Sequence, residues 1–250
     1  MLPRFLVPAL APADRVVALP ADESRHLARA RRLRPGDAVR VFDGRGLEYL
    51  ARVERIGRSS VTVTLIEPVA PAAESPTRIT VAQALLSGDK IDGIVRDLTM
   101  LGIAAFHPIV SARSPIALAA VRRSRRIERW RRIAAASAKQ CGRAVVPEIR
   151  DPLGLQDWLN ADTSGIRLHL VEPAGDAPSG TGGIPDASRD RQKTSVALLV
   201  GPEGGWTAEE ATMAAAAGFV PWTLGSRTLR ADAAPLVAVS IIQFLWGDLG

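Results

Sequence analysis

Several residue types that define protein classes are scarce in this sequence of 250 residues. Cys141 is the only cysteine, so a disulfide framework and metal sites built on pairs of thiolates are both excluded. The longest apolar stretch, at residues 234–246, is shorter than the roughly 18 residues that a membrane-spanning helix needs. Arg4 and Pro8 interrupt any apolar segment near the N-terminus, so we expect no secretion signal. These absences predict a cytoplasmic protein with no membrane segment and no bound metal.

Charge, by contrast, is abundant and unevenly distributed. The formal net charge is +6, but residues 1–150 together carry +12 and residues 151–250 carry −6. Such an asymmetry is typical of a protein of which one part binds a polyanion such as nucleic acid. A bias towards arginine explains why lysine is rare, but it does not explain why the bases concentrate in the first 150 residues. Aromatic residues make up only 4% of the chain, so we expect recognition of folded RNA by shape rather than by stacking of many bases.

The residues before position 73 are predicted to form a compact β-rich domain, residues 1–72. Residues 24–33 form a short, arginine-rich helical segment that ends at Pro35-Gly36. Residues 38–67 alternate apolar and polar side chains around turn signals, which is typical of short strands. Residues 68–77 are rich in proline and alanine without periodicity, and we interpret them as a linker.

After the linker the pattern changes to alternating strands and helices. Strands are expected at residues 79–85, 106–110, 167–171, 195–200 and 220–224. Helices are expected at residues 91–101, 122–141, 208–217 and 233–246, and the composition of residues 174–194 predicts a long loop. This alternation indicates an α/β domain with a largely parallel sheet, spanning residues 73–250.

The most informative segment is LLVGPEGGWTAEE, at residues 198–210. A buried strand is expected to run into the glycine-rich turn, and Thr207 with Glu210 three residues later has the spacing of a helix-capping box. Glycines let a backbone approach a ligand closely, but they also serve in turns that bind nothing. The segment matches neither the phosphate-binding P-loop nor the dinucleotide-binding pattern, so the residues alone leave ligand binding and a tight turn both open.

A second loop, LGSRTLRAD at residues 224–232, follows the next expected strand. Loops at the carboxyl ends of neighbouring parallel strands are where α/β sheets bind their ligands. Arg230 and Asp232 stand just before an apolar helix. Taken alone, they are better explained as an exposed arginine and a helix-capping aspartate than as ligand contacts.

Taken together, these two loops resemble a known family. GPEGGW followed by TAEE, and then LGSRTLRADAA, resemble the RsmE-type ribosomal RNA small subunit uridine-N3 methyltransferases, which belong to the SPOUT class. HLARARRLRPGD near the N-terminus resembles the PUA-like RNA-binding domain of that family. Shorter matches in between include Gly88-Asp89-Lys90 and Arg129-Trp130, so the resemblance extends over nearly the whole chain.

The resemblance implies a two-domain architecture and a reaction. The N-terminal domain would be PUA-like, and the α/β domain would be a SPOUT methyltransferase domain with a C-terminal trefoil knot. The protein would be a homodimer that transfers a methyl group from S-adenosylmethionine to ring N3 of a uridine in small-subunit (16S) ribosomal RNA, either free or in the assembled subunit. Arg230 would stabilise negative charge on the uracil ring, and Asp232 would accept the N3 proton.

The resemblance also places the ligand contacts. The cofactor-binding residues would be Val171, Glu172, Val200, Gly201, Pro202, Glu203, Gly204, Gly205, Leu224, Gly225, Leu229, Arg230 and Ala231. The RNA-binding residues would be Arg4, Arg25, His26, Arg29, Arg32, Arg113 and Arg143. Seven further arginines lie between residues 122 and 132, where phosphate contact and simple solvation both remain open.

Some positions depart from the family pattern. Met100 stands where the family has glutamate, Lys139 likewise replaces a glutamate, and Ser87 occupies a position where lysine is common. Asp232-Ala233 replaces a Glu-Thr pair, which shortens the acid and removes a hydroxyl. These changes motivate one alternative, a catalytically divergent RNA-binding or ribosome-assembly protein with the same fold. A second alternative, an enzyme using another nucleotide, is disfavoured by the missing dinucleotide pattern.

Two histidines are expected to be structural. His107 precedes a proline in an expected strand, and His169 alternates within an apolar strand. We expect His169 to be a core residue with its hydrogen bonds satisfied.

Overall fold

The computed structural model describes residues 2–11, 13, 15–30, 33–58, 60–162, 164–173 and 195–250. The chain divides into two compact units. The first comprises Met1–Glu74 together with Ala135–Val146, and the second comprises Ser75–Ala134 together with Pro147–Gly250. The domain limits expected from the sequence, residues 1–72 and 73–250, remain a prediction, and the structure adds that residues 135–146 pack with the N-terminal unit.

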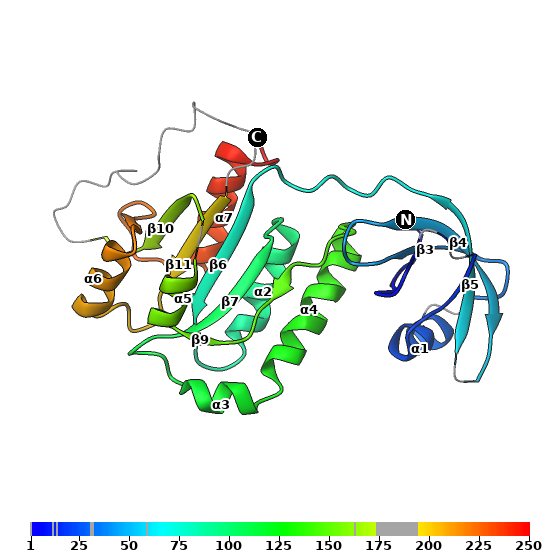
Figure 1. Ribbon diagram of the computed structural model, residues 1–250, viewed down its shortest axis with the longest axis horizontal. Coiled ribbons are helices and arrows are strands. Elements are labelled where there is room, and N and C mark those ends of the chain that lie inside the picture. Colours follow the sequence, from blue (N-terminus) through cyan, green and yellow to red (C-terminus); the bar gives the residue numbers. More distant parts are fainter. Residues whose placement is uncertain are drawn as a thin grey trace. The chain divides into compact units, whose positions relative to one another are not determined.

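The first unit is built on a five-stranded sheet in the order β1-β3-β4-β5-β2 (Figure 1). Its elements are β1 (Arg4–Leu6), β2 (Val16–Ala18), α1 (Ala21–Ala30), β3 (Ala38–Phe42), β4 (Glu48–Ile56) and β5 (Val61–Pro68). Strand β1 runs parallel to β3, and the other neighbours are antiparallel. Alternate residues such as Val39, Val41 and Val63 are completely buried, which is why the sequence alternates there.

Residues 135–146 join this unit through ion pairs. Lys139 Nζ lies 2.7 Å from Glu23 Oε2, and the Arg143 guanidinium donates to the carboxylate of Glu74. The lysine that departs from the family pattern therefore has a structural partner, since Glu23 is buried and needs an opposite charge.

The second unit is built on a seven-stranded sheet whose named pairings are all parallel. The strand order is β12-β10-β11-β6-β7-β8, with β9 also paired to β7. The strands are β6 (Arg78–Ala84), β7 (Ala105–Val110), β8 (Glu148–Ile149), β9 (Leu153–Gly154), β10 (Ile166–Leu170), β11 (Ser195–Val200) and β12 (Val220–Trp222). The α/β class with a parallel sheet is thereby confirmed.

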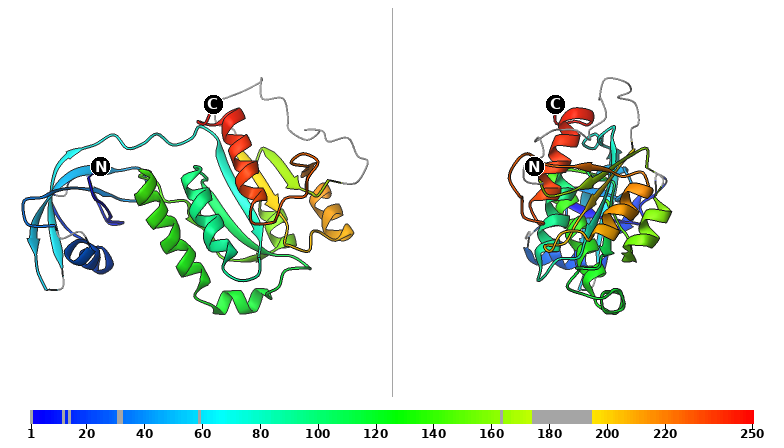
Figure 2. Two further views of the ribbon diagram at one scale, coloured as in Figure 1. Left: turned by 180° about the vertical axis from the view of Figure 1, so that it is seen from behind. Right: turned by 90° about the vertical axis from the view of Figure 1, so that its left-hand side faces the viewer.

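Helices cover both faces of this sheet (Figure 2). They are α2 (Lys90–Met100), α3 (Leu118–Arg123), α4 (Arg126–Cys141), α5 (Leu155–Ala161), α6 (Ala208–Ala216) and α7 (Ala234–Trp246). Helices α5 and α6 pack on one face, where Trp158 and Phe219 join the alanines and leucines of β6 and β11 in one core. Helices α2 and α7 contact each other on the opposite face. None of the helices in the described part of the chain combines the length and the hydropathy needed to cross a bilayer.

The prediction of a single helix at residues 122–141 is wrong in one respect. The helix is interrupted between Arg123, where α3 ends, and Arg126, where α4 begins. Ser124 is extended, with φ −85° and ψ 163°. Its hydroxyl donates to Val121 O at 2.8 Å and accepts from Arg126 N at 3.3 Å. Serine competes in this way for backbone groups that a continuous helix would use, so it ends one helix and begins the next.

Candidate active site

A cavity of about 740 Å³ lies where the strands β10, β11 and β12 end. Its walls come from residues 169–173, from residues 200–208 and from most of residues 224–234. Lys90, Arg113 and Ala211 complete the lining. The three long segments meet because β12, β10 and β11 are adjacent parallel strands, whose carboxyl ends share one edge of the sheet.

The structure brings together nearly all the site residues expected from the sequence. Of the thirteen expected cofactor-binding residues, all except Gly225 line this cavity, and the expected catalytic pair Arg230 and Asp232 lines it too. Gly225 lies in the same loop, with a φ of +80°. The cavity groups these residues, while their individual roles stay predictions.

The glycines of the loop at residues 201–205 are needed for space and for conformation. A Cβ atom at Gly201 would lie 3.0 Å from Trp206 Nε1, and one at Gly204 would lie 3.3 Å from Arg113 Cδ. Gly205 has a φ of +68°, a conformation that other residues adopt only with strain. The capping box at Thr207 and Glu210 is present, as the sequence predicted, so α6 begins at a defined point after the loop.

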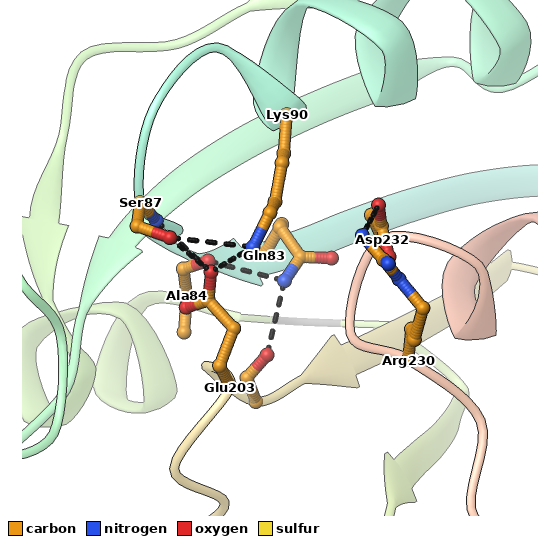
Figure 3. A network of polar contacts seen from close by, with 8 residues as sticks. Gln83, Ala84, Ser87, Lys90, Glu203, Arg230 and Asp232 are labelled. Atoms are coloured by element: carbon orange, nitrogen blue, oxygen red, sulfur yellow. Dashed lines mark hydrogen bonds and ion pairs between the residues drawn. The ribbon is translucent and has the colours of Figure 1, made fainter.

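Side chains from outside hold this loop at three points, and Figure 3 shows the contacts of Gln83, Ser87 and Lys90. Gln83, which is completely buried at the end of β6, donates from Nε2 to Gly201 O at 3.1 Å. Lys90 and Ser87 both donate to the Glu203 carboxylate, and Arg113 Nη1 donates to Gly204 O at 2.6 Å. Burial alone raises the pKa of Glu203, but the hydrogen bonds from Lys90, Ser87 and the backbone outweigh it and lower that pKa to about 2.

Arg230 and Asp232 form a second ion pair in the cavity. The Arg230 side chain is 75% exposed and donates hydrogen bonds to both oxygens of the Asp232 carboxylate. This hydrogen bonding holds the pKa of Asp232 below its usual value. The two groups expected to be catalytic are thus bound to each other in the structure.

His169 corrects a prediction. It is buried, as expected, and its ring packs edge-on against Trp206 with the ring centroids 5.0 Å apart. Its Nε2, however, has no hydrogen-bond partner among the described residues, and the residue lines the cavity. Burial lowers the pKa of His169 to about 4, so the imidazole is neutral at pH 7.

Two of the expected RNA-binding arginines are structural instead. Arg4 is buried, and its five N–H groups are used by Glu48 and by the carbonyls of Ala138, Lys139 and Arg143. Arg143 is also buried, with its guanidinium on Glu74. The folded N-terminal unit uses these two side chains internally, so their placement gives no support to the prediction that they contact RNA.

The other expected RNA contacts have different placements. Arg25 and His26 are exposed on α1. The side chain of Arg29 and the whole of Arg32 lie outside the described residues. Arg113 is exposed and lines the cavity, so it belongs to the same site as the expected cofactor residues.

The arginines between residues 122 and 132 divide into two groups. Arg129 pairs with Asp92, Arg131 pairs with Asp151, and Arg122 donates to Pro152 O. Within the described residues, the remaining four have no carboxylate partner: Arg123, Arg125, Arg126 and Arg132. Charge on α3 and on the first turns of α4 is therefore only partly neutralised.

Comparison with known proteins decides the family. Residues 73–243 match the RNA methyltransferase domain, and residues 19–66 match the RNA methyltransferase PUA domain. The chain belongs to the ribosomal RNA small subunit methyltransferase E family. It is 32% identical to the family member from Synechocystis, over 93% of this chain and 74% of the relative, and 27% identical to the one from Bacillus subtilis, over 91% and 89%.

Solved structures agree with this family. The methyltransferase E of Neisseria gonorrhoeae, solved with S-adenosyl methionine bound, superimposes with a TM-score of 0.89 and 32% identity over the full length of both chains. The expected family and the expected fold, a PUA domain followed by an α/β methyltransferase domain of the SPOUT type, are confirmed.

The sequence gives little local sign of the outer supports of the cavity. Lys90 stands in a short family motif, and no sequence pattern assigns Gln83 or Ser87 to the site. A polar residue at the carboxyl end of an otherwise buried strand, such as Gln83, is the one local signal that could have drawn attention to them.

Proposed function

We propose that this protein methylates ring N3 of a uridine in small-subunit ribosomal RNA, with S-adenosylmethionine as methyl donor. The observation that carries the proposal is the convergence of three strand ends on one cavity that contains the loop at residues 201–205 and the Arg230–Asp232 pair. Membership of the methyltransferase E family supports the reaction class, and the cofactor-bound relative supports the donor.

The cavity fits such a donor better than it fits a polyphosphate. Its volume is within the range of small-molecule sites, and glycine backbone forms much of one wall. Two of its four cationic side chains, Lys90 and Arg230, are already paired with Glu203 and Asp232, and the other two are Arg113 and Arg227. The residues that would hold the donor are the twelve expected ones that line the cavity, and the donor when bound would supply a methyl group made electrophilic by a positively charged sulfur.

The chain's own residues would handle the proton and the charge of the acceptor. Neutral uracil carries a proton on N3, so its removal is required before the nitrogen can attack. Asp232 would accept this proton, directly or through a water. Arg230 would donate to a ring carbonyl oxygen, on which the negative charge develops.

The ion pair between these two residues sets an order of events. While Nε and Nη2 of Arg230 donate to the two oxygens of Asp232, these two groups are not available to donate to a uracil carbonyl. Movement of Arg230 to the substrate would leave Asp232 without its partner and return its pKa towards the usual value. The carboxylate would therefore become a stronger base only once the substrate has engaged Arg230.

RNA would bind mainly through basic side chains. Among the described residues, Arg25, His26 and Arg113 keep the exposure that this role needs. We retain Arg29 and Arg32 as proposed contacts from the family resemblance. The four arginines of α3 and α4 without carboxylate partners would add contacts to backbone phosphates.

The assembly and topology follow the family expectation. We propose a C-terminal trefoil knot formed around the loops of the cavity, and a cytoplasmic homodimer with the sites at its interface. The partly exposed apolar side chains Val237 and Phe244 on α7 support the dimer, because Phe244 is 64% exposed.

The decisive experiment is mass mapping of small-subunit ribosomal RNA from a deletion strain. Loss of one methyl group from a single uridine, restored by the wild-type gene but not by the Arg230→Ala variant, would establish the reaction and its target. Unchanged RNA would exclude the proposal. If calorimetry also showed no binding of S-adenosylmethionine, the non-catalytic RNA-binding alternative would stand.

A further inference from the structure

The Glu203 side chain lines the cavity and accepts several hydrogen bonds from one neighbouring turn. One oxygen, Oε1, accepts three hydrogen bonds: from Lys90 Nζ at 2.7 Å, from Ser87 Oγ at 2.7 Å and from Ser87 N at 3.1 Å. Figure 3 shows these bonds between the turn that follows β6 and the loop that follows β11. Two neighbouring parallel strands are thus tied together just beyond their carboxyl ends.

Stability does not account for this arrangement. The Lys90 and Glu203 side chains are 33% and 36% exposed, and ion pairs that are open to solvent contribute little to folding. The ion pair instead lies in the cavity lining, on the middle residue of the loop Gly201-Pro202-Glu203-Gly204-Gly205.

The loop needs external support because of its composition. Gly204 and Gly205 have wide conformational freedom, and the donor is expected to bind to the loop's backbone. Gln83 holds Gly201, and its orientation is fixed because Nε2 donates to two carbonyls, Ala84 O and Gly201 O. Arg113 donates to Gly204 O. Among the described residues, Lys90 and Ser87 hold the segment between these two points, through the side chain of Glu203.

We propose that Lys90 is a positioning residue for the methyl-donor loop. With Ser87, it holds Glu203 so that the backbone of residues 201–205 keeps its binding conformation before the donor arrives. Glu203 would then contact the donor only through the loop backbone, and its carboxylate would serve to fix the conformation of that backbone. Ser87, where the family commonly has lysine, supplies two of the three hydrogen bonds in this chain. This inference rests on the proposed function.

The test compares donor affinity and loop protection in four proteins: wild type, Lys90→Met, Glu203→Gln and the double variant. We expect Lys90→Met to weaken binding of S-adenosylmethionine, measured by calorimetry, by about tenfold, with a smaller fall in kcat at saturating donor. The donor affinity of the double variant should be no lower than that of the single variant with the lower affinity, because both changes remove the same contact. Lys90→Arg, which keeps the charge, should restore most of the affinity.

The matched control is Arg96→Met. Arg96 lies on the same helix α2 and forms an exposed ion pair with Asp97, but it does not line the cavity. This variant should bind the donor within about twofold of wild type. The variant shows whether loss of any positive charge on α2 weakens donor binding, or only loss of the charge that contacts Glu203.

Hydrogen exchange of the ligand-free protein separates failure of this inference from failure of the proposed function. Lys90→Met should speed exchange of the amides of residues 203–205, whatever ligand the loop takes. Faster exchange without donor binding in the wild type would retain the positioning role and reject the proposed function. Donor binding by the wild type, with unchanged affinity and exchange in Lys90→Met, would overturn the positioning role alone. Additive losses in the double variant would also overturn it, by showing direct contact of the Glu203 carboxylate with the donor.

Discussion

Arg230 and Asp232 are joined at two points across a single intervening residue, with Nε–Oδ1 and Nη2–Oδ2 distances of 2.9 Å. The pair lies in the same cavity as the loop at residues 201–205. A side-by-side ion pair of this kind leaves both groups neutralised until a ligand competes for one of them. The proposed catalytic cycle therefore begins with the exchange of Asp232 for a substrate carbonyl as the partner of Arg230.

Removal of Arg230 should affect turnover far more than donor binding. We expect Arg230→Ala to lower kcat by about 10²–10³, as is typical for loss of a group that stabilises developing negative charge, with a donor affinity within a few-fold of wild type. Single-turnover methylation and calorimetry would measure the two quantities. Wild-type turnover in the variant would exclude Arg230 from catalysis, and loss of donor binding alone would assign it to the cofactor.

The pH dependence should differ between kcat/KM and kcat. In the free protein, hydrogen bonding to Arg230 holds the pKa of Asp232 below its usual value, so Asp232 stays ionised to lower pH. In the complex, Arg230 is engaged by the substrate and this effect is lost. The acidic limb of kcat should therefore lie at a higher pH than that of kcat/KM. Coincident limbs would contradict the exchange of partners, and Asp232→Asn should abolish both limbs together with most of the activity.

Two buried histidines should make the fold sensitive to mild acid. Burial lowers the pKa of both His107 and His169 to about 4 from the ordinary 6.5. Below pH 6.5 the unfolded chain takes up protons that the folded chain does not, so stability falls as the pH drops from 6.5 to 4. We expect about 1–2 kcal/mol per histidine, allowing for solvent screening. Urea denaturation across this range should show a shallower loss for His107→Gln.

Substitution of Arg4 should destabilise the protein, whereas substitution of Arg25 should not. Arg4→Met removes the main partner of the buried Glu48 and should destabilise the N-terminal unit by about 3–5 kcal/mol. Arg25→Met changes an exposed side chain and should leave stability within about 0.5 kcal/mol of wild type. Urea denaturation would measure both. Equal stability of the two variants would contradict the internal role assigned to Arg4.

RNA affinity should depend steeply on salt if the unpaired arginines contact phosphates. Loss of each single-strand phosphate contact should reduce the slope of log affinity against log salt by about 0.7. A variant with Arg123, Arg125 and Arg132 changed to glutamine should therefore show a slope lower by about 2. Filter binding across a salt series would measure it. The same slope as wild type would mean that these side chains are simply solvated.

Local signals explain most of what could be predicted. The strand, glycine turn and capped helix around residues 198–210 depend on neighbours a few positions apart, so periodicity and the capping box identified them. The two-residue strands β8 and β9 and the short strands β1 and β2 are too brief to show a period, and they were missed. The helix is interrupted at Ser124 although the apolar pattern continues through it, because the Ser124 hydroxyl forms hydrogen bonds with backbone groups that a continuous helix would use.

By itself, the sequence determined the α/β class, the two loops of the site and, through its resemblance, the family. Only the tertiary structure decided which charges are available. Arg4 and Arg25 are the same residue type in basic surroundings, yet one is enclosed by Glu48 and three carbonyls while the other is exposed. Likewise, the adjacency of β6 to β11 brings Lys90 to Glu203, 113 positions away. Long-range pairings of this kind depend on strand order, which no local pattern encodes.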